Sequence, residues 1–564
     1  MHKRRGILMT AMLILCLTLA MVPLTDMLSS GENQEQDALR QAIADTLSIQ
    51  RKHESRPPDV AVMPCMDIED VWAIEDTRRE AGQQLVKCLK NGKSRLGYDR
   101  EQDTFYCTIG METGDDWPQI QLFAESDAQE ELHIAWVDDY TYDYPCDAME
   151  DEYRYELIAY TDTQYAYIGV VFTGLPIVTM DIFYDGEVEE QYVPAHVSVA
   201  GAGYEAIDTA ALTHMHGGGV YKGIDKFSYR IQFHDEMGRG SKKTKDLSVL
   251  GMEADSDWLL ICNAQEETAA RNYLAYEMWK MWHADEPAPM KLESELVELF
   301  VDDEYMGIYQ LMERVDAQEE ILGMGGDLQT DSAVRLVIAS NRGEKPSKSY
   351  GTRSSFFAEY RYGPGEDADA VFERFDAYAR MNEIVEDRPD DEEFAELAQK
   401  YVDLDSALNY YLFMQACGLS DNVINNLYVW MMEEEGRMVY KFSPWDMDYC
   451  LLETGFQEDG SVVPYFEEKM VFVHRMLDLN LMNSRERLWE IWQEKRKTIL
   501  SDAAVWDWIM DMQTYLNASG AYRRESNKWR GGAYQVNMTP MLDFELEHLW
   551  TVESTLAQRW PLED

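Results

Sequence analysis

The sequence predicts an α+β protein with two unequal lobes, in which strands dominate the first part of the chain and helices the last. Short apolar and aromatic runs separated by turn residues continue from Leu85 to about Val199, the pattern typical of β-strands. Helical periodicity dominates from Ala368 to the C-terminus. Strands followed by helices favour separate layers over an alternating order. Of the 564 residues, 46% are hydrophobic and 12% aromatic, so the chain can build packed cores.

The chain is strongly acidic. It has 50 Lys and Arg against 105 Asp and Glu, a formal net charge of −55. Such a surface repels phosphate backbones, so we expect no nucleic-acid partner. Opposite charge accelerates encounter, so a Lys/Arg-rich protein that offers Ser or Thr is the favoured partner. Solubility or a salty habitat explains the acidity equally well.

The N-terminus has the pattern of an export signal. A basic start, Met1–Arg5, precedes an almost unbroken apolar run, Gly6–Leu24. The run nearly reaches the roughly 20 residues that span a bilayer. Residues 1–28 are therefore predicted to be a signal peptide or a membrane anchor. We expect an exported protein, extracellular or on the cell surface, that is attached to the membrane through this segment if the segment is not cleaved.

Four regions follow this leader. Residues 29–84 are rich in Glu and Gln in their first part and include Arg56-Pro57-Pro58, which predicts a polar stalk and linker. Residues 85–174 are predicted to form a small β-sandwich-like accessory domain, with strands at Thr104–Ile109, Gln119–Phe123, Leu132–Trp136, Tyr153–Ile158 and Ala166–Phe172. In residues 175–315 strands mix with one helix, and residues 316–564 form the helical lobe and tail.

The first motif that indicates chemistry is Asp421 followed five positions later by Asn426, just after the amphipathic stretch Ala407–Cys417. This is the spacing of a kinase catalytic loop, in which the Asp accepts the proton of the attacking hydroxyl and the Asn holds a magnesium ion. The spacing alone is weak evidence, because Asp and Asn after a helix are more often part of an ordinary turn or cap.

The second motif is Pro444-Trp-Asp-Met-Asp448, in which Asp446 and Asp448 lie two residues apart. In extended backbone both carboxylates point the same way. Paired hard oxygens suit Mg²⁺, and the aromatic neighbours predict a sheltered site. The alternatives are a calcium site, which the absence of an EF-hand pattern disfavours, and a solvated loop.

A third segment extends from His214 to Val315. It begins with the glycine-rich string His214–Gly219, in which the bare amides of Gly217 and Gly218 are able to face an anion. Its predicted elements are a strand at Lys226–Phe233, a helix at Glu266–Trp279 with Glu277 beside the apolar face, and a hairpin of Leu296–Val301 and Met306–Met312 around Asp302-Asp303-Glu304. The chain leaves this hairpin at Glu313–Val315, as a kinase chain reaches its hinge.

Taken together in this order, these motifs resemble the spore coat protein H (CotH) kinase family. The resemblance rests on Leu247–Trp258, Ala270–Glu277, Gly307–Arg314, Asp421 with Asn426, and Pro444–Asp448. It covers roughly residues 175–452 and extends to the helical tail. Asp302-Asp303 replaces the Asn-Gly turn usual in the family, a departure that should affect the hairpin more than the chemistry.

The resemblance implies an atypical protein-kinase-like fold, with residues 175–315 as its N-lobe and 316–564 as its helical C-lobe and tail. It implies binding of ATP with Mg²⁺ and phosphorylation of Ser or Thr on a protein, the chain itself included. Asp421 would be the catalytic Asp, and the metal ligands would be Asn426 and Asp446, with Asp448 as a further candidate. Lys226 or Arg230 would contact the phosphates of the nucleotide, and Glu277 would orient that cation. Arg271 would have a phosphate-binding or structural role. The backbone of Met312, Glu313 and Arg314 would contact the adenine, and the turn of Gly217 and Gly218 would also contact the nucleotide.

Two other functions compete with this interpretation. His216-Gly-Gly-Gly219 is also an oxyanion-hole string of esterases, but the chain has no Gly-x-Ser-x-Gly elbow to carry the nucleophile. A non-catalytic surface or coat-assembly scaffold would use the same fold for protein or glycan binding. The accessory domain is a candidate for wall-glycan binding.

Overall fold

The computed structural model describes residues 65–562, apart from 82–84, 112–119, 127–129, 138–141, 143–144, 185–190, 217–225, 237–242, 265, 286–289, 316–331, 337–358, 363–372, 388–389, 420–421, 423–425 and 452–469. The chain separates into two compact units, Met1–Val60 and Ala61–Asp564, and all described residues belong to the second. The predicted leader, most of the predicted stalk, and Gly217, Gly218 and Asp421 lie outside the described residues. None of the helices in the described ranges combines the length and the apolar character needed to cross a membrane.

The accessory module consists of two sheets around one core. Its elements are α3 (Ile68–Thr77), β1 (Arg79–Glu80), β2 (Cys88–Asn91), β3 (Ser94–Arg95), β4 (Gly97–Asp99), β5 (Thr104–Thr108), β6 (Leu122–Glu125), β7 (His133–Trp136), the 3-10 turn η3 (Pro145–Ala148), β8 (Arg154–Tyr160) and β9 (Gln164–Thr173). One sheet has the order β4-β5-β9-β8-β7 with β1 beside β9, and the other has the order β3-β2-β6. Buried residues from both sheets, such as Leu89 and Phe105, share one apolar cluster.

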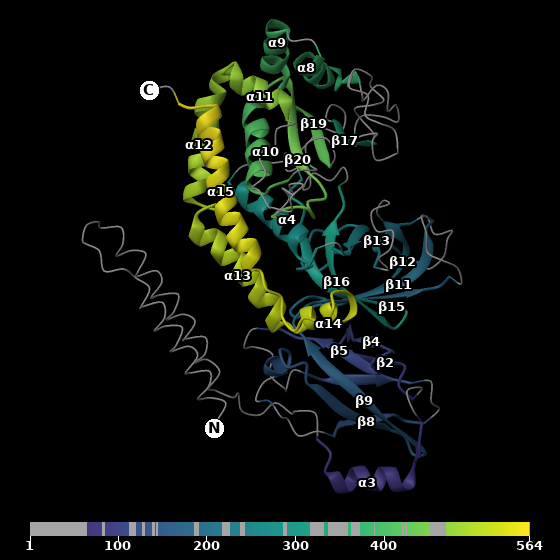
Figure 1. Cartoon of the computed structure of the whole chain (residues 1–564). Helices are drawn as coiled ribbons and strands as arrows, with labels where there is room; N and C mark the ends of the chain where they lie inside the picture. The colour runs from purple at the N-terminus through teal and green to yellow at the C-terminus, as the bar shows by residue number, and fades with distance from the viewer. Residues whose placement is uncertain are drawn as a thin grey trace, which may run out of the picture. The chain divides into compact units, whose positions relative to one another are not determined.

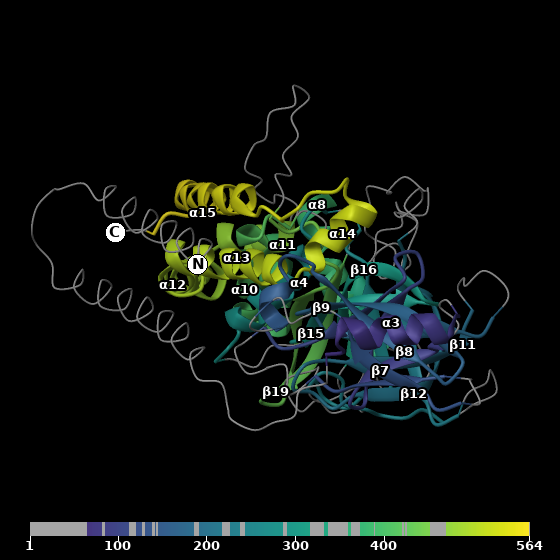
Figure 2. The same ribbon diagram turned by 90° about the horizontal axis from the view of Figure 1, so that it is seen from below.

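Helix α3 belongs to this module. Its buried Val71 and Ile74 pack against Ala135 of β7 and Ile158 of β8, where Figure 2 shows the helix over these strands. The sequence placed α3 and β1 in the polar linker, because a ten-residue helix with only two buried side chains has a weak apolar pattern. The strands predicted around β5, β7, β8 and β9 are confirmed.

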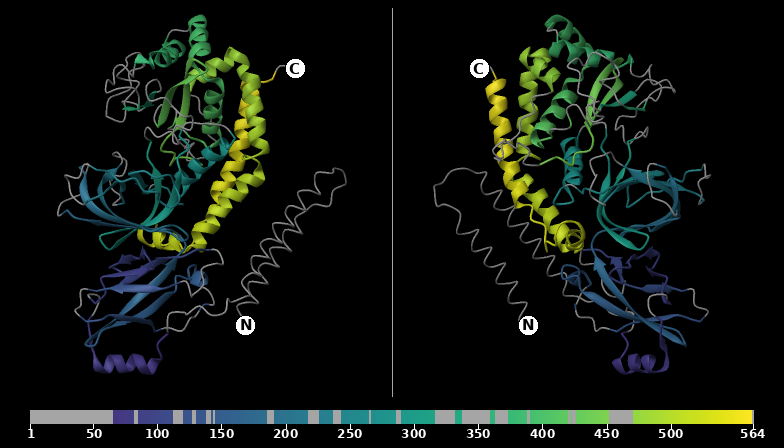
Figure 3. Two further views of the ribbon diagram at one scale, coloured as in Figure 1. Left: turned by 180° about the vertical axis from the view of Figure 1, so that it is seen from behind. Right: turned by 45° about the vertical axis from the view of Figure 1, so that its right-hand side comes forward.

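A closed β-barrel follows (Figure 3). It consists of β10 (Ile177–Ile182), β11 (Val193–Ala200), β12 (Ile207–His216), β13 (Ser228–His234), β14 (Asp257–Ile261), β15 (Ser294–Val301) and β16 (Glu304–Glu313), with α4 (Arg271–Trp282) inserted between β14 and β15. The strand order is β10-β11-β12-β13-β14-β16-β15, and β10 closes the barrel by pairing in parallel with β15. The alternating pattern predicts strands but not this closure, because the closing pair joins strands far apart in the sequence.

The predicted hairpin around Asp302 and Asp303 is confirmed as β15–β16, with Val301 opposite Glu304. Both turn residues have positive φ, 50° and 63°, which Asp tolerates better than most residues. The structure stabilises this turn without the usual Asn-Gly. The backbone N–H of Ile182 donates to Asp302 Oδ1 at 2.7 Å, and Arg100 donates to Asp303 Oδ2 at 2.9 Å.

The last part combines helices with a four-stranded sheet of order β18-β17-β19-β20. The strands are β17 (Ser332–Leu336), β18 (Glu359–Tyr362), β19 (Leu427–Glu434) and β20 (Arg437–Pro444); the helices are α8 (Asp376–Asp387), α9 (Asp391–Tyr401), α10 (Leu404–Ala416), α11 (Val471–Asp478), α12 (Ser484–Lys497), α13 (Asp502–Ala518), α14 (Ala521–Trp529) and α15 (Thr539–Arg559), with the 3-10 turn η6 (Leu481–Asn483). Helix α10 packs against α12 and α15, which Figure 1 shows alongside it. The mixed α+β class is confirmed.

One apolar core connects α4 with this helical part. It includes Trp279 and Trp282 of α4, Phe413 of α10 and Phe442 of β20, all at most 1% exposed. Trp282 also donates its indole N–H to Asn409 of α10 at 2.8 Å. Helix α4 is thereby fixed between the barrel and the hairpin β19–β20, which places it beside the predicted metal-binding residues.

Candidate active site

Two of the predicted metal ligands meet at one end of the β19–β20 hairpin. The last pair of the ladder is Leu427 opposite Pro444, so Asn426 precedes β19 at the same end at which Trp445 and Asp446 follow β20. The backbone N–H of Trp445 donates to the carbonyl oxygen of Asn426 at 2.8 Å. Strand pairing therefore brings Asn426 and Asp446, twenty positions apart in the sequence, to neighbouring places.

Asn422 joins these two segments, and sequence reasoning missed it. Its side chain is fully buried, and Nδ2 donates to the carbonyl oxygens of Trp445 at 2.7 Å and Asn426 at 3.2 Å. Its own carbonyl accepts the hydroxyl of Tyr410 from α10. The only sequence signal was its place directly after Asp421, and that signal does not distinguish a structural amide from a metal ligand.

Helix α4 is hydrogen-bonded to the same turn. Asn272 accepts the backbone N–H of Met447 on Oδ1 at 2.8 Å, and its Nδ2 donates to Gln310 of β16 at 2.8 Å. The backbone N–H of Asp446 donates to the hydroxyl of Tyr276 at 3.3 Å. The turn that carries Asp446 is therefore bonded to α4, and through Asn272 to the barrel.

The backbone at this point is strained. Asn426 has φ 53° and Asp446 has φ 56°, both in the left-handed region, which Asn and Asp tolerate better than other residues with a side chain but occupy less readily than glycine. Such a conformation costs on the order of 1–3 kcal/mol and persists where surrounding bonds hold it. The bonds from Asn422, Tyr276 and Asn272 supply that support. Strained residues of this kind concentrate at functional sites.

The donor atoms at this end of the hairpin fit magnesium. Amide and carboxylate oxygens are the ligands that Mg²⁺ prefers, and proteins often supply only one or two of them, with substrate phosphates and water completing the shell. Asp446 and Asp448 are half-buried and Asn426 is buried. In the ranges that the structure describes, no three His, Cys, Asp or Glu side chains gather to hold a metal. The arrangement is thus that of a partial ligand set rather than a closed structural metal site.

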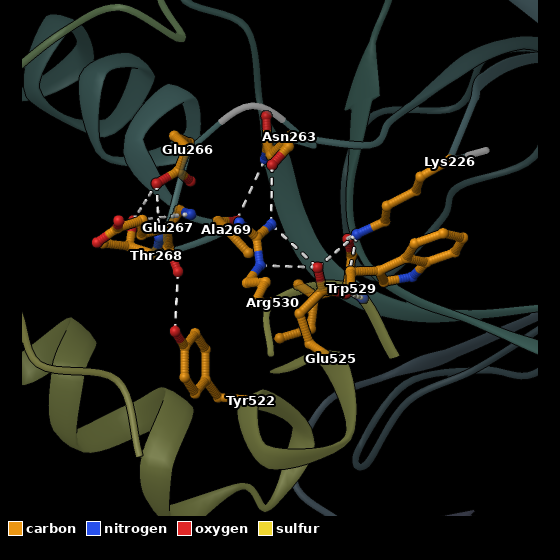
Figure 4. A network of polar contacts seen from close by, with 12 residues as sticks. Lys226, Asn263, Glu266, Glu267, Thr268, Ala269, Tyr522, Glu525, Trp529 and Arg530 are labelled. Atoms are coloured by element: carbon orange, nitrogen blue, oxygen red, sulfur yellow. Dashed lines mark hydrogen bonds and ion pairs between the residues drawn. The ribbon is translucent and has the colours of Figure 1, made fainter. Parts of the chain in front are cut away.

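Lys226 does not have the surroundings that the sequence predicted. It is 0% exposed, and its Nζ contacts both carboxylate oxygens of Glu525 at 2.8 Å and the carbonyl oxygen of Ile308 at 2.9 Å (Figure 4). An ammonium group has three N–H donors, and three protein oxygens surround this one. Burial lowers the pKa of Lys226, against the opposing effect of the Glu525 carboxylate.

The expected pair of Lys226 with Glu277 is therefore wrong. Glu277 instead contacts Lys280, three residues along the same helix, at 2.7 Å. Burial raises the pKa of the Glu277 carboxyl. The partner of Lys226 is in α14, 299 positions further along the chain, and no local pattern indicates such a contact.

Glu525 is the centre of this buried network. Besides Lys226, it accepts the backbone N–H of Ile308 at 2.7 Å and Arg530 Nε at 3.0 Å. Arg530 continues to the carbonyl oxygen of Asn263 at 2.9 Å (Figure 4). Trp529 donates to the carbonyl oxygen of Met306 at 2.9 Å. The network fastens α14 to the barrel through β16 and the segment after β14.

The other two basic candidates also contact protein groups. Arg230 is paired with Asp257 across β13 and β14, and Arg314 reaches the same carboxylate at 2.9 Å. Arg271 donates through Nη1 to the carbonyl oxygens of Cys450 and Leu451, just beyond Asp448. Of the two roles left open for Arg271, the structure provides direct contacts for the structural one.

Helix α4 begins at Arg271, later than the predicted start at Glu266. The Glu266 carboxylate accepts the backbone N–H groups of Thr268 at 2.7 Å and Arg271 at 3.2 Å. Residues before Arg271 therefore form a capping turn rather than a first helical turn. Glu266, the predicted first residue of the helix, instead caps it.

The predicted adenine contact at Met312 and Glu313 conflicts with the sheet. Met312 is paired with Leu259 of β14 and Ser294 of β15, and Glu313 is paired with Trp258. Strand neighbours on both sides use the backbone N–H and C=O groups that a hinge would offer to adenine. Burial raises the pKa of the Glu313 carboxyl to about 7. Strand β16 ends at Glu313, which was predicted to lie in the hinge after the strand.

The family comparison agrees with the resemblance seen in the sequence. The model of CotH kinase proteins matches residues 214–549, which is more than half of the 564 residues. No match was found among curated proteins. The matched range begins in β12, includes α4, the β19–β20 hairpin and α14, and ends within α15. The chain belongs to the CotH kinase protein family.

Proposed function

We propose that this chain is an exported, ATP-dependent protein kinase of the CotH type. It transfers the γ-phosphate of ATP to Ser or Thr of a secreted or surface protein, itself included. The observation that carries the proposal is the meeting of Asn426 and Asp446 at one end of the β19–β20 hairpin, in strained conformations held by buried side chains. Membership of the CotH kinase protein family also supports the proposal. Kinases hold Mg²⁺ with oxygen ligands beside the catalytic loop, and Asn426 and Asp446 offer such ligands.

In this proposal the residues at this end of the hairpin have separate roles. Asn426 and Asp446 would hold Mg²⁺, with Asp448 as a further ligand, and the ion would supply positive charge beside the transferred phosphate. Asp421 accepts the proton of the substrate hydroxyl. Asn422, Asn272 and Tyr276 keep the ligand-bearing segments in register through the bonds described above. The barrel and the helical part correspond to the two lobes of a kinase.

A non-catalytic scaffold for protein or glycan binding is the second candidate, and one observation favours it. Lys226, Arg230 and Arg271, the three basic residues predicted for the phosphates, all contact protein oxygens. A kinase with this arrangement needs another cation for the phosphates or a rearrangement of one of these three. A scaffold needs neither.

The partner and the location follow from charge and from the leader. A net charge of −55 favours a basic protein substrate. The apolar N-terminal run supports export of the chain, with membrane attachment through this run if it is not cleaved. Both statements rest on the sequence.

Incubation of the purified chain with labelled ATP and Mg²⁺ tests the proposal. Wild type should incorporate phosphate on Ser or Thr, and Asp421→Asn and Asp446→Asn should each abolish incorporation. Asp511→Asn, an equal charge change on the exposed face of α13, is the matched control and should label as wild type does. A wild type that incorporates nothing and gains no thermal stability from Mg²⁺ and ATP would favour the scaffold.

A further inference from the structure

A cavity of about 510 Å³ lies where the accessory module, the barrel and α14 meet. The accessory module contributes most of its wall, the barrel contributes Tyr305 of β16, and α14 contributes Arg524, Asn527 and Lys528. Cavities of this volume fall within the range of small-molecule and side-chain binding sites. None of its lining residues belongs to the candidate active site.

The cavity is built on a closely fitted junction. Tyr106 and Val171 of the accessory sheet form one apolar cluster with Ile177, Phe300 and Tyr305 of the barrel. Gly97 of β4 permits this approach, because a Cβ there would lie 2.4 Å from the ring of Phe300. Arg524 is 7% exposed and bonds Glu298 of β15 at 2.8 and 2.9 Å and Thr173 of β9 at 2.8 Å. The walls are therefore held by contacts independent of any ligand.

Each cation in the wall already has a carboxylate partner. Arg524 is paired with Glu298, Arg154 with Glu156 at 3.2 Å, and Lys528 with Glu304 at 2.6 Å. The lining carboxylate Glu152 is likewise paired, with Arg524 at 3.2 Å. Anion binding would require one of these pairs to break.

Two other carboxylates that line the cavity, unlike Glu152, form no ion pair with the described residues. Asp99 and Glu101 have no ion-pair partner within the described part of the chain. Asp99 is only 7% exposed, and its Oδ1 accepts the backbone N–H of Glu101 at 3.0 Å. Burial raises the pKa of Asp99, against the opposing effects of the Glu101 N–H and the Lys528 charge. The hydroxyl of Tyr305, which is 4% exposed, has no partner among the described residues at hydrogen-bond distance and angle, and burial together with the nearby Glu298 carboxylate raises its pKa.

We propose that this junction cavity binds a cationic group, an ammonium or a guanidinium, with Asp99 and Glu101 as its anionic contacts. A buried carboxylate that is not bonded to a cation gains most from a charged hydrogen-bond donor, and the neighbouring hydroxyl provides a further polar contact. The cation comes from a Lys or Arg side chain of a peptide segment, or from a free polyamine. The site is independent of phosphoryl transfer.

Calorimetric titration of the full chain tests the site with two probes of the same charge chemistry. A short oligolysine peptide represents a basic protein segment, and spermidine represents the free amines. Binding of the peptide alone identifies a protein ligand, and binding of spermidine in the same cavity identifies a small amine. In both cases the double variant Asp99→Asn/Glu101→Gln should weaken binding by about ten- to a hundredfold, because it removes both contacts with the cation.

Two further variants separate the cavity from the general acidity of the chain. Asp543→Asn/Glu547→Gln makes the same charge change on exposed positions of α15 and should leave the affinity within about twofold of wild type. Asn527→Trp fills the cavity from its exposed α14 position without a change of charge and should abolish binding. Equal weakening by the two double variants, unchanged binding in Asn527→Trp, or no binding of either probe to wild type would overturn the proposal. Kinase activity does not enter these outcomes.

Discussion

Replacement of Glu525 by glutamine should strongly destabilise the protein, although the two side chains have the same shape. Oε1 of Glu525 faces Lys226 and Arg530, and Oε2 faces Lys226 and the backbone N–H of Ile308. Whichever way the amide is turned, its NH₂ group lies against another donor. The charge of Lys226 also remains buried without an anionic partner.

The expected cost follows from these contacts. Removal of one partner from a buried ion pair costs about 3–5 kcal/mol, and Glu525→Gln should fall in this range. Lys226→Met should cost less, about 2 kcal/mol, because Glu525 keeps Arg530 and the N–H of Ile308. In the double variant no ammonium faces the amide, so the cost should be smaller than the sum by about 1–3 kcal/mol.

Urea unfolding followed by tryptophan fluorescence measures these free energies of unfolding. Glu547→Gln, at an exposed position of α15, is the matched control and should change the free energy of unfolding by no more than about 0.5 kcal/mol. If Glu525→Gln behaved like this control, or if the two single changes were additive in the double variant, the buried network of Lys226 and Glu525 would be refuted.

Three further predictions concern other parts of the molecule. Asn422→Ala should lower the free energy of unfolding by about 2 kcal/mol, because it removes the side-chain donor to the Trp445 carbonyl and one of the two donors to the Asn426 carbonyl; a denaturation midpoint equal to that of wild type would contradict this. Gly97→Val should separate the accessory module from the barrel, detected as faster hydrogen exchange in β4 and β5, and Phe300→Ala in the same chain should partly reverse the effect. The carboxyl of Glu313, whose pKa burial raises to about 7, stabilises the fold below its unfolded pKa and loses that stabilisation as the pH rises through 7. Unfolding between pH 5 and 8 should therefore show a fall in stability for wild type that is shallower in Glu313→Gln, and equal slopes would contradict the assignment.

The sequence predicted local elements well where short-range chemistry decides them. Alternation of apolar residues placed β5, β8 and β9, and the Asp302–Asp303 turn was found within its hairpin. The predicted helix 266–279 is observed at 271–282, because Glu266 caps the helix from the preceding turn and apolar periodicity does not locate a helix start. Such differences are small in space and reflect competition among local bonds.

Contacts between distant parts of the chain could not be predicted. The closure of the barrel by β10 and β15 depends on a pairing over more than one hundred positions. The partner of Lys226 depends on where α14 packs against the barrel. Glu277 was predicted instead because kinases pair this lysine with a glutamate of the helix that follows its strand. Asn426 and Asp446 were predicted as metal ligands from two separate motifs and from the family resemblance, whereas the hairpin that brings them to the same end was not predicted.

The central claim is that Asn426 and Asp446 hold a magnesium ion with ATP at the end of the β19–β20 hairpin. Calorimetric titration of the full chain with ATP in the presence of Mg²⁺ tests it most directly, with Asp446→Asn and Asp511→Asn measured under the same conditions. We expect binding by wild type and Asp511→Asn, dependent on Mg²⁺, and an affinity at least about tenfold lower in Asp446→Asn, since the change removes a charged metal ligand. Equal affinity of Asp446→Asn and wild type, or binding that does not require Mg²⁺, would contradict the claim.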